Sequence, residues 1–415
     1  MIYRVEGGVP LCGSVKIGGS KNAALPILFA TLLTRGKSTL TGIPDITDTK
    51  TVLSLLQSFG ATVSYPEQGT VEIDTTDLSY TTPSESFTRS IRASTYLIGA
   101  CLGRFGRVEI PTFGGCSFCE RPIDLHLMAV RAFGGEITEN EIFCKQLCAN
   151  KVIFPKISVG ATVNGLLLAS QIREMSVLEN VAIEPHVLAL VGFLRRAGCH
   201  ISLCHTPRPT FLVRGGRLHG VRMRMIPDMI EAGTYLLCPL LTGGEVTALD
   251  IAPSHLFSFF SLAEQMGASV RIGERCATLS RTAPPRPVHI RCAPYPGIAT
   301  DLSPLLSAVL ARYGTGTITD TVFPSRRSFL SPYRALGANA VEEDAHIRFL
   351  APDAPRADTV SVPDLRTGAG VLLYALSLDT PITVHDSADY ILRGYEHFTK
   401  KLNALGANVG EVTPR

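Results

Sequence analysis

One short phrase recurs along the whole chain and constrains its fold more than any other feature: an apolar helix end, a Gly, and then a strand. Its copies occupy residues 58–63, 132–137, 196–201, 265–270, 335–340 and 404–409. The first Gly of each copy is residue 60, 134, 198, 267, 337 or 406, with gaps of 74, 64, 69, 70 and 69 residues. A helix that ends in the left-handed conformation accepts Gly at little cost. The spacing predicts six repeats of about 69 residues, which divide into two α/β domains of three.

The first repeat can be assigned from its apolar periodicity. The predicted order is strand 15–17, helix 22–34, strand 38–42, helix 48–59 and a closing strand pair at 61–64 and 71–74. The third repeat follows the same order, with helices at 162–170 and 185–196 and a strand at 199–203. The last repeat reaches the end of the chain, and the sequence leaves open whether both termini share a domain.

Length and composition exclude several classes of protein. The chain has 415 residues, 45% of them hydrophobic and 18% charged, which suits two folded domains of about 200 residues. A net charge of +3 disfavours a nucleic-acid binder but permits a small anionic substrate. The N-terminus lacks the regions of a signal peptide, and no apolar run reaches the ~18 residues of a membrane span. We therefore expect a cytoplasmic protein that binds neither membrane nor nucleic acid.

Eleven cysteines in a chain without an export signal are expected to be thiols. Cys101, Cys199 and Cys238 stand in apolar runs and are expected in the core. Cys116 and Cys119 form a single CxxC pair without a suitable second pair, so we expect no metal site.

The first helix of each repeat opens with small polar residues or Gly. The openings are residues 20–22, 90–92, 158–160, 227–228, 300–301 and 363–364. Helix capping alone would explain most of them. At the first opening, Asn22 is a good candidate for the helix cap. With a cap there, Pro26 would lie in the first turn of the helix, where a proline is tolerated. Helix N-termini also attract anions, so openings that face one cleft would suit phosphates and carboxylates.

The segment 112–126 carries the most reactive set of residues. Gly114 and Gly115 predict a flexible loop with Cys116 at its tip, followed by Arg121. A thiol near Arg can have a lowered pKa and act as an acid or nucleophile near neutrality. A loop thiol without a function is the alternative that the spacing leaves open.

Several basic residues stand at repeat junctions: Lys21, Arg92, Arg326, Arg366 and Arg393. They could bind carboxylates or phosphates, or be solvated surface charges. Asp301 could be a general base toward a sugar hydroxyl or a helix cap. His126 and His186 are interpreted as structural hydrogen-bonding residues. No GxGxxG, Walker or HExxH motif is present, which disfavours dinucleotide, nucleoside-triphosphate and zinc-protease sites.

Together these motifs resemble the UDP-N-acetylglucosamine 1-carboxyvinyltransferases, a family of enolpyruvyl transferases. The matching segments are 19–26 (GSKNAALP), 91–94 (IRAS), 114–116 (GGC), 121–126 (RPIDLH), 156–162 (KISVGAT), 227–228 (PD), 300–301 (TD), 321–323 (TVF), 364–366 (DLR) and 393–396 (RGYE). The resemblance implies two inverted α/β-barrel-like domains, each of three βαβαββ units, with the active site in the cleft between them. One domain would cover residues 21–225 and the other residues 1–20 with 226–415.

The resemblance also implies an activity: transfer of the enolpyruvyl group of phosphoenolpyruvate to the 3′-hydroxyl of UDP-N-acetylglucosamine, the first committed step of peptidoglycan synthesis. It implies small-molecule substrates, no metal or organic cofactor and no obligate protein partner. Cys116 would be the general acid and Asp301 the base, with Lys21 and Arg393 also catalytic and with Asp364 and Arg366 nearby. The phosphoenolpyruvate ligands would be Lys21, Asn22, Arg121 and Arg393. The sugar-nucleotide ligands would be Asn22, Arg92, Arg121, Pro122, Ile123, Asp124, Leu125, Lys156, Ile157, Ser158, Val159, Asp301 and Val322.

The chain departs from the family pattern at a few positions. Ile183 and Met229 replace arginines, and residues 324–325 read Pro-Ser where the family has Glu-Asn. Cys119 replaces a usual Gly, and we expect that oxidation could pair it with Cys116 and stop the reaction. The family's loop cysteine is the target of the epoxide fosfomycin, so alkylation of Cys116 is expected. The alternatives are a shikimate 3-phosphate enolpyruvyl transferase, a catalytically inactive sugar-nucleotide binder and an enzyme acting on nucleic-acid ends.

Overall fold

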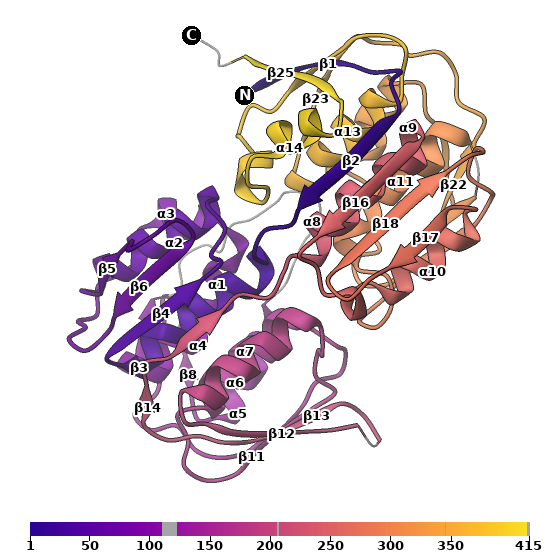
Figure 1. Ribbon diagram of the computed structural model, residues 1–415. Coiled ribbons are helices and arrows are strands. Elements are labelled where there is room, and N and C mark those ends of the chain that lie inside the picture. Colours follow the sequence, from indigo (N-terminus) through magenta and orange to yellow (C-terminus); the bar gives the residue numbers. More distant parts are fainter. Residues whose placement is uncertain (110–122, 206, 315, 345, 413–415) are drawn as a thin grey trace. The chain divides into compact units, whose positions relative to one another are not determined.

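The structure is a computed structural model that describes residues 1–109, 123–205, 207–314, 316–344 and 346–412 (Figure 1). Two compact units divide these residues. Residues 19–109, 123–205 and 207–226 form one unit, here the continuous domain. Residues 1–18, 227–314, 316–344 and 346–412 form the other, here the discontinuous domain.

Each domain consists of three repeats, and five of the six repeats have a four-stranded sheet, whereas the described part of repeat 2 has the three-stranded sheet β7-β9-β8. In repeat 3, β10 and β11 are parallel, and β13 and β12 continue the sheet in antiparallel order. The two intervening helices, α6 and α7, lie over one face of this sheet (Figure 1). The prediction of repeated α/β units with two helices and a closing strand pair is therefore confirmed.

The continuous domain contains repeats 1 to 3. Repeat 1 has β15 (Arg222–Arg224), α1 (Lys21–Ala30), η1 (Thr31–Leu33), β4 (Lys37–Thr41), α2 (Thr47–Ser58), β5 (Thr62–Ser64) and β6 (Thr70–Asp74). Repeat 2 has α3 (Glu85–Ser90), η2 (Arg92–Tyr96), α4 (Leu97–Phe105), β7 (Arg107–Glu109), α5 (Asp124–Ala132), β8 (Glu136–Ile137) and β9 (Glu141–Phe143). Repeat 3 has β10 (Lys151–Ile153), α6 (Val159–Ala169), β11 (Ser176–Glu179), α7 (Pro185–Arg196), β12 (His200–Cys204) and β13 (Thr210–Arg214). A short parallel pair joins β3 (Thr34–Arg35) to β14 (Leu218–His219).

The discontinuous domain contains repeats 4 to 6. Repeat 4 has β2 (Leu11–Lys16), α8 (Met229–Leu236), α9 (Cys238–Thr242), β16 (Gly244–Leu249), η3 (Pro253–His255), α10 (Phe257–Gln265), β17 (Ser269–Ile272) and β18 (Cys276–Arg281). Repeat 5 has β19 (His289–Cys292), η4 (Thr300–Leu302), α11 (Ser303–Tyr313), β20 (Thr317–Asp320), α12 (Leu330–Ala335), β21 (Asn339–Glu342) and β22 (Ile347–Leu350). Repeat 6 has β23 (Thr359–Ser361), α13 (Leu365–Leu376), β24 (Ile382–His385), η5 (Ile391–Arg393), α14 (Phe398–Ala404), β25 (Asn408–Val412) and the N-terminal β1 (Ile2–Glu6).

The two N-terminal strands, β1 and β2, complete sheets whose other strands lie far away in the sequence. β1 lies between β24 and β25, so both ends of the described chain share one sheet. β2 pairs in parallel with β16, and β15 takes the corresponding place beside β4. The prediction of strand 15–17 as the first strand of repeat 1 was wrong. Local periodicity finds a strand, but its partner depends on contacts more than 200 residues away in sequence.

The phrase that recurs in the sequence marks the end of the second helix in every repeat. The first Gly of each copy has a positive φ, between 91° and 111°. Each follows α2, α5, α7, α10, α12 or α14 within two residues. The Gly residues are therefore required by the left-handed backbone, as the sequence predicted.

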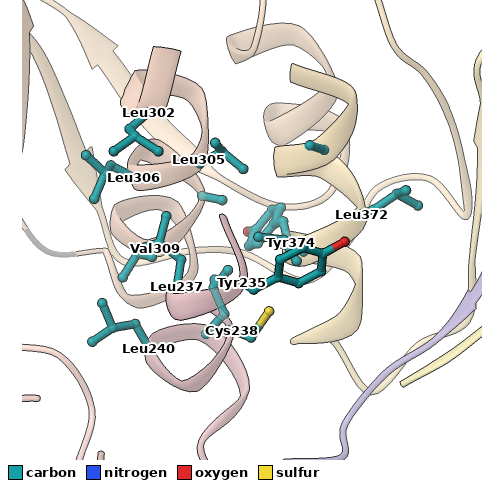
Figure 2. Close-up of a cluster of buried hydrophobic side chains, with 14 of the residues drawn as sticks. Tyr235, Leu237, Cys238, Leu240, Leu302, Leu305, Leu306, Val309, Leu372 and Tyr374 are labelled. Carbon is teal, nitrogen blue, oxygen red and sulfur yellow. The ribbon is translucent and has the colours of Figure 1, made fainter. Parts of the chain in front are cut away.

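The core of each domain is built around the first helix of each repeat. In the discontinuous domain, α8, α11 and α13 are buried along nearly their whole length. Figure 2 shows part of this core, where Tyr235, Val309 and Tyr374 from these helices belong to one cluster. A helix that is apolar all round must be enclosed by neighbours, which explains the long apolar runs in the sequence. The expected burial of Cys101, Cys199 and Cys238 is confirmed.

The first helix of the chain begins one residue earlier than predicted. Ser20 is its N-cap, because its hydroxyl accepts a hydrogen bond from the backbone N–H of Ala23 at 3.3 Å. Asn22 is the second helical residue, so Pro26 lies inside α1 rather than in its first turn. Within the described residues, none of the helices has the length and apolar character needed to cross a membrane.

Candidate active site

The start of α1 carries a buried ion pair. Lys21 Nζ lies 2.7 Å from Asp48 Oδ2, and the two side chains are only 11% and 3% exposed. Asp48 stands in the first turn of α2, where an acidic residue is normally interpreted as favourable to the helix dipole. In the sequence, Asp48 therefore gave no sign of a role in a site. Its carboxylate fixes the direction of the Lys21 ammonium group, and Asn22, the next residue of α1, is half-buried.

A second group of predicted residues gathers around the starts of η2, α5 and α6 in the continuous domain. Arg92 is the first residue of η2 and Asp124 the first of α5, and the charges of both act on the buried His126. Residues 156–159 lead into α6, where the Ser158 hydroxyl accepts from the N–H of Ala161 at 3.3 Å. The structure therefore confirms Ser158 as an N-cap.

Exposure differs among the neighbours of these helix starts. Lys156 and Asp124 are exposed, Ile123, Ile157 and Val159 are half-buried, and Leu125 is buried. Leu125 belongs to the hydrophobic core of the domain. Leu125 is therefore suited to contact a ligand only through its backbone.

His126 is held by a hydrogen bond inside the continuous domain. Its Nδ1 lies 2.6 Å from the amide nitrogen of Asn164 in α6. Burial lowers the pKa of His126 to about 4, and the positive charge of Arg92 acts in the same direction. The ring is therefore neutral near pH 7, and the interpretation of His126 as a hydrogen-bonding residue is confirmed.

In the discontinuous domain, Asp301 lies between two buried arginines. Its carboxylate oxygens are 3.5 Å from Arg326 and 3.2 Å from Arg366. The Asp301 side chain is 26% exposed, whereas those of the arginines are 3% and 6% exposed. The carboxylate is therefore held by two buried cations and remains partly exposed, which is compatible with contact to a substrate.

Arg366 is itself fixed by an aromatic ring. Its guanidinium carbon lies 5.3 Å from the centre of the Tyr395 ring, and the Tyr395 hydroxyl is 2.9 Å from that of Thr234. Burial alone would lower the pKa of Arg366, but Tyr395 and Asp301 raise it above its ordinary value. Arg366 thus remains a cation beside Asp301. Tyr395 stands in the motif 393–396, but nothing in the sequence indicated a role for its side chain.

Asp364 differs from Asp301 in being buried, and both of its oxygens accept hydrogen bonds. One accepts from the backbone N–H groups of Arg366 and Thr367, each at 3.0 Å, and the other from the hydroxyls of Ser328 and Thr367, each at 2.7 Å. Asp364 is therefore the N-cap of α13 and supports Arg366 through the helix.

Val322 lies in a turn that a buried carboxylate holds. Asp320 accepts from the N–H groups of Val322 and Phe323, each at 2.9 Å. Thr300, next to Asp301, also bonds to Asp320. The turn and the start of η4 are thereby joined, so the structure brings Val322 and Asp301 together. In the sequence, Asp320 is only a residue at the end of a strand, and nothing indicated that it supports the site.

The remaining predicted site residues are Arg393, which the structure describes, and three that lie outside the described residues. Arg393 is the last residue of η5 in the discontinuous domain and is half-buried. Cys116, Arg121 and Pro122 lie outside the described residues, and so does Cys119. In the described ranges, no group of three or more His, Cys, Asp or Glu side chains could hold a metal ion.

Two of the positions that depart from the family pattern, Ile183 and Met229, carry apolar side chains in apolar surroundings. Ile183 is partly buried against the core of the continuous domain, and Met229 against that of the discontinuous domain. Met229 also lines a small cavity with Leu256, Ile298 and Leu302. Pro324 and Ser325 are exposed.

Comparisons with known proteins cover the whole chain. A family model described as EPSP synthase (3-phosphoshikimate 1-carboxyvinyltransferase) matches residues 5–402. The chain is 35% identical to UDP-N-acetylglucosamine 1-carboxyvinyltransferase 2 of Staphylococcus aureus, covering 99% of both chains. It is also 35% identical to UDP-N-acetylglucosamine 1-carboxyvinyltransferase of Halorhodospira halophila, covering 98% of both.

Solved structures agree on the fold. The crystal structure of the enolpyruvyl transferase NikO from Streptomyces tendae matches with a TM-score of 0.86 and 23% identity, over 99% of this chain and 98% of that one. EPSP synthase from Acinetobacter baumannii matches with a TM-score of 0.74 and 17% identity over 100% of both chains. The predicted enolpyruvyl transferase fold is confirmed. The chain belongs to the EPSP synthase family and, by its full-length identity, to its UDP-N-acetylglucosamine 1-carboxyvinyltransferases.

Proposed function

We propose that this protein transfers the enolpyruvyl group of phosphoenolpyruvate to the 3′-hydroxyl of UDP-N-acetylglucosamine and releases phosphate. The observation that carries the proposal is 35% identity, over 99% of both chains, to a relative named for this reaction. The geometry supports it, because each domain has cations and helix starts, which suit anionic substrates.

Cations supply the binding of phosphoenolpyruvate in this proposal. Lys21, Arg121 and Arg393 pair with its phosphate and carboxylate, and Asn22 contributes a neutral donor. Lys21 is already oriented by Asp48 at 2.7 Å, so little side-chain entropy is lost on binding. The segments that start η2, α5 and α6, together with Asp301 and Val322, bind the sugar nucleotide.

Asp301 acts as the base in the proposed reaction. It takes the proton of the 3′-hydroxyl while that oxygen attacks C2 of phosphoenolpyruvate, and Cys116 donates a proton to C3. The product of this addition is a tetrahedral phospholactoyl ketal. Loss of a proton from C3 then restores the double bond, and the C2–O bond to phosphate breaks. This chemistry requires neither a metal nor an organic cofactor, and its partners are small molecules.

Phosphate release with two acceptors tests the substrate. Purified protein with phosphoenolpyruvate should release phosphate when UDP-N-acetylglucosamine is added and not when shikimate 3-phosphate is added. Release only with shikimate 3-phosphate would show that the protein catalyses the alternative reaction, enolpyruvyl transfer to shikimate 3-phosphate. Tight sugar-nucleotide binding without release from either acceptor would identify an inactive binding protein.

The same assay tests Cys116. The C116A variant should lose most of the turnover, by about a hundredfold or more, because general acid catalysis is removed. C204A is the matched control, since Cys204 is an exposed thiol at the end of β12. Equal turnover of C116A and C204A would exclude Cys116 as the acid.

A further inference from the structure

Tyr395 is a buried polar side chain of the discontinuous domain to which the proposed reaction assigns no step. It follows η5, and its backbone N–H donates to the carbonyl of Ile391 at 3.1 Å. Its ring centre lies 4.6 Å from that of Phe398, and only 1% of the residue is exposed. A buried hydroxyl requires hydrogen-bond partners, so the partners of Tyr395 indicate what the hydroxyl does.

The contacts of Thr234 decide where the hydrogen of the Tyr395 hydroxyl points. The Thr234 hydroxyl donates its single hydrogen to the carbonyl of Ile230 at 2.7 Å, one turn earlier in α8. The Thr234 Oγ1 atom also lies 2.9 Å from the Tyr395 hydroxyl oxygen. Because the hydrogen of Thr234 is already used, Tyr395 must be the donor in this second bond. The lone pairs of the Tyr395 oxygen are then left for another donor.

Arg366 is that donor. A guanidinium group can only donate, so the Tyr395 oxygen accepts in the hydrogen bond that these two side chains share. Arg366 is 5% exposed, and its Nη2 donates to Asp301 Oδ2 at 3.2 Å. The bonds therefore form one continuous series, from Asp301 through Arg366 and Tyr395 to Thr234 in α8.

Two side-chain contacts determine the orientation of the Arg366 guanidinium. The group is planar and its N–H donors form a rigid fork, so bonds to two separate acceptors leave it one orientation. With the Asp301 contact alone, the group could turn about its own bonds and carry the carboxylate with it. The backbone N–H of Arg366 is already bonded to Asp364 at 3.0 Å. The side chain, and not the backbone, is therefore what Tyr395 fixes.

We propose that Tyr395 is a positioning residue for the reaction: its hydroxyl accepts from Arg366 and so holds the guanidinium in the orientation that fixes the carboxylate of Asp301. The effect on turnover rests on the proposed function, in which Asp301 takes the proton of the sugar hydroxyl. A displacement of about 1 Å in a reacting group can cost about a hundredfold in rate. The contact of Tyr395 with Arg366 therefore matters for turnover although Tyr395 acts only through its neighbours.

Tyr395→Phe removes the hydroxyl and keeps the ring. It should lower kcat for phosphate release by about tenfold or more, because Asp301 is held less precisely. The Kd of UDP-N-acetylglucosamine, measured by titration calorimetry, should stay within about threefold, because the other sugar-nucleotide contacts are unchanged. An unchanged kcat, or a loss that appears in Kd alone, would overturn the proposal.

Tyr333→Phe is the matched control. Tyr333 is also fully buried in this domain, and its hydroxyl donates to the carbonyl of Pro304 at 2.7 Å. The control therefore loses a buried tyrosine hydroxyl and one hydrogen bond but no contact of Arg366. Its kcat should equal that of wild type. Equal losses of kcat in the two Phe variants would show that any buried hydroxyl has this effect, which would contradict the proposed role.

Thr234 offers a second test that leaves Tyr395 intact. Thr234→Ser keeps the hydroxyl that accepts from Tyr395, so kcat should stay within about threefold of wild type. Thr234→Val has a similar shape without the hydroxyl, and it should lower kcat by about fivefold or more. Equal kcat values in the two variants would exclude the series of hydrogen bonds as the means of positioning.

A double-mutant cycle tests whether Tyr395 acts through Arg366. Arg366→Lys removes the planar fork, so adding Tyr395→Phe to it should lower kcat by no more than about twofold further. Losses that multiply would mean that Tyr395 acts by another route, and the proposal would be wrong.

NMR of the Arg366 guanidinium tests the positioning without turnover. Hydrogen bonds that hinder rotation should give Arg366 separate 15N–1H signals for its Nη groups in wild type and in Tyr333→Phe, and Tyr395→Phe should merge them. Separate signals in Tyr395→Phe would overturn the positioning role. Wild-type protein without turnover would instead remove the proposed function, and the guanidinium signals would still decide whether Tyr395 fixes Arg366.

Discussion

At the scale of single residues, two carboxylates of the discontinuous domain show how surroundings decide a role. Asp364 is buried, and its two oxygens accept four hydrogen bonds. Asp301 keeps 26% of its side chain exposed while Arg326 and Arg366 hold it. A buried carboxylate whose two oxygens accept hydrogen bonds stabilises its helix. A carboxylate that is held in place but partly exposed can take a proton.

Substitution of these two carboxylates should separate stability from catalysis. Asp301→Asn should lower kcat by about a hundredfold or more while the protein stays folded, because the amide cannot accept the hydroxyl proton. Asp364→Asn should instead lower the free energy of unfolding by about 1–3 kcal/mol, since bonds to the α13 cap are lost. Phosphate release and urea unfolding measure the two effects. An Asp301→Asn enzyme with more than about a tenth of wild-type kcat would rule out Asp301 as the base.

The buried imidazole of His126 should make stability depend on pH. Burial, aided by Arg92, lowers its pKa from 6.5 to about 4. Between these values the unfolded chain binds a proton that the folded ring does not, so the free energy of unfolding decreases as the pH falls. The loss should reach about 3 kcal/mol near pH 4. Urea unfolding of wild type and His126→Asn from pH 7.5 to 4.5 checks this, and parallel pH curves would contradict it.

At the scale of elements, the second helix of all six repeats is followed by a Gly in the left-handed conformation. The Gly residues at these ends have nearly the same positive φ although their surroundings differ. A Cβ at Gly337 would be 2.4 Å from a backbone oxygen, whereas one at Gly406 would have no atom within 4 Å. The shared requirement is therefore the left-handed conformation and not the space.

Gly406 isolates the cost of that conformation. Gly406→Ala should lower the free energy of unfolding by about 1–2 kcal/mol, because a side chain in the left-handed region is strained. Gly410→Ala is the matched control, since Gly410 in β25 also has open space but no positive φ. Urea unfolding should show little change for the control. A Gly406→Ala protein as stable as its control would show that the helix end has no such requirement.

At the scale of the whole molecule, the two domains differ in how their sheets are completed. The continuous domain closes the first sheet with β15, a strand from its own end. The discontinuous domain takes β1 and β2 from the N-terminal 18 residues, and both lie inside or along its sheets. One domain is therefore contained in a single segment and the other is not.

Excised fragments should behave accordingly. A fragment of residues 19–226 should fold alone and unfold cooperatively, because its sheets and core are complete. A fragment of residues 227–415 lacks β1 and β2, so two of its sheets would expose unpaired edges. Circular dichroism and urea unfolding compare them. A disordered 19–226 fragment, or a cooperatively folded 227–415 fragment, would contradict this account of the fold.

Sequence patterns predict what is local in this molecule. The six Gly positions, the caps Ser158 and Asp364, and the buried first helices depend on neighbours along the chain, and the structure confirms them. The partner of strand 15–17 was assigned wrongly because the alternatives β4 and β16 are indistinguishable by local periodicity. Ser20 and Asn22 are both good caps, so only the structure selects Ser20.

Residues of the candidate site could be predicted from the sequence only where they stand in motifs of the family. Asp301 and Arg366 stand in motifs of the family, and the structure brings them within 3.2 Å. Asp48 and Asn164 were missed, since an acid in a first helical turn and an Asn in an apolar helix each have an ordinary structural explanation. Their roles follow from which buried group each one contacts, and such contacts join distant segments.

Identification of the product tests the central claim most directly. Protein incubated with phosphoenolpyruvate and UDP-N-acetylglucosamine should yield a sugar nucleotide whose NMR spectrum shows two vinyl protons and a substituted 3′-oxygen, with one phosphate released per product. Asp301→Asn should yield none in the same time. A product substituted at another hydroxyl would contradict the assigned position. Unchanged UDP-N-acetylglucosamine after prolonged incubation with folded protein would contradict the proposed function itself.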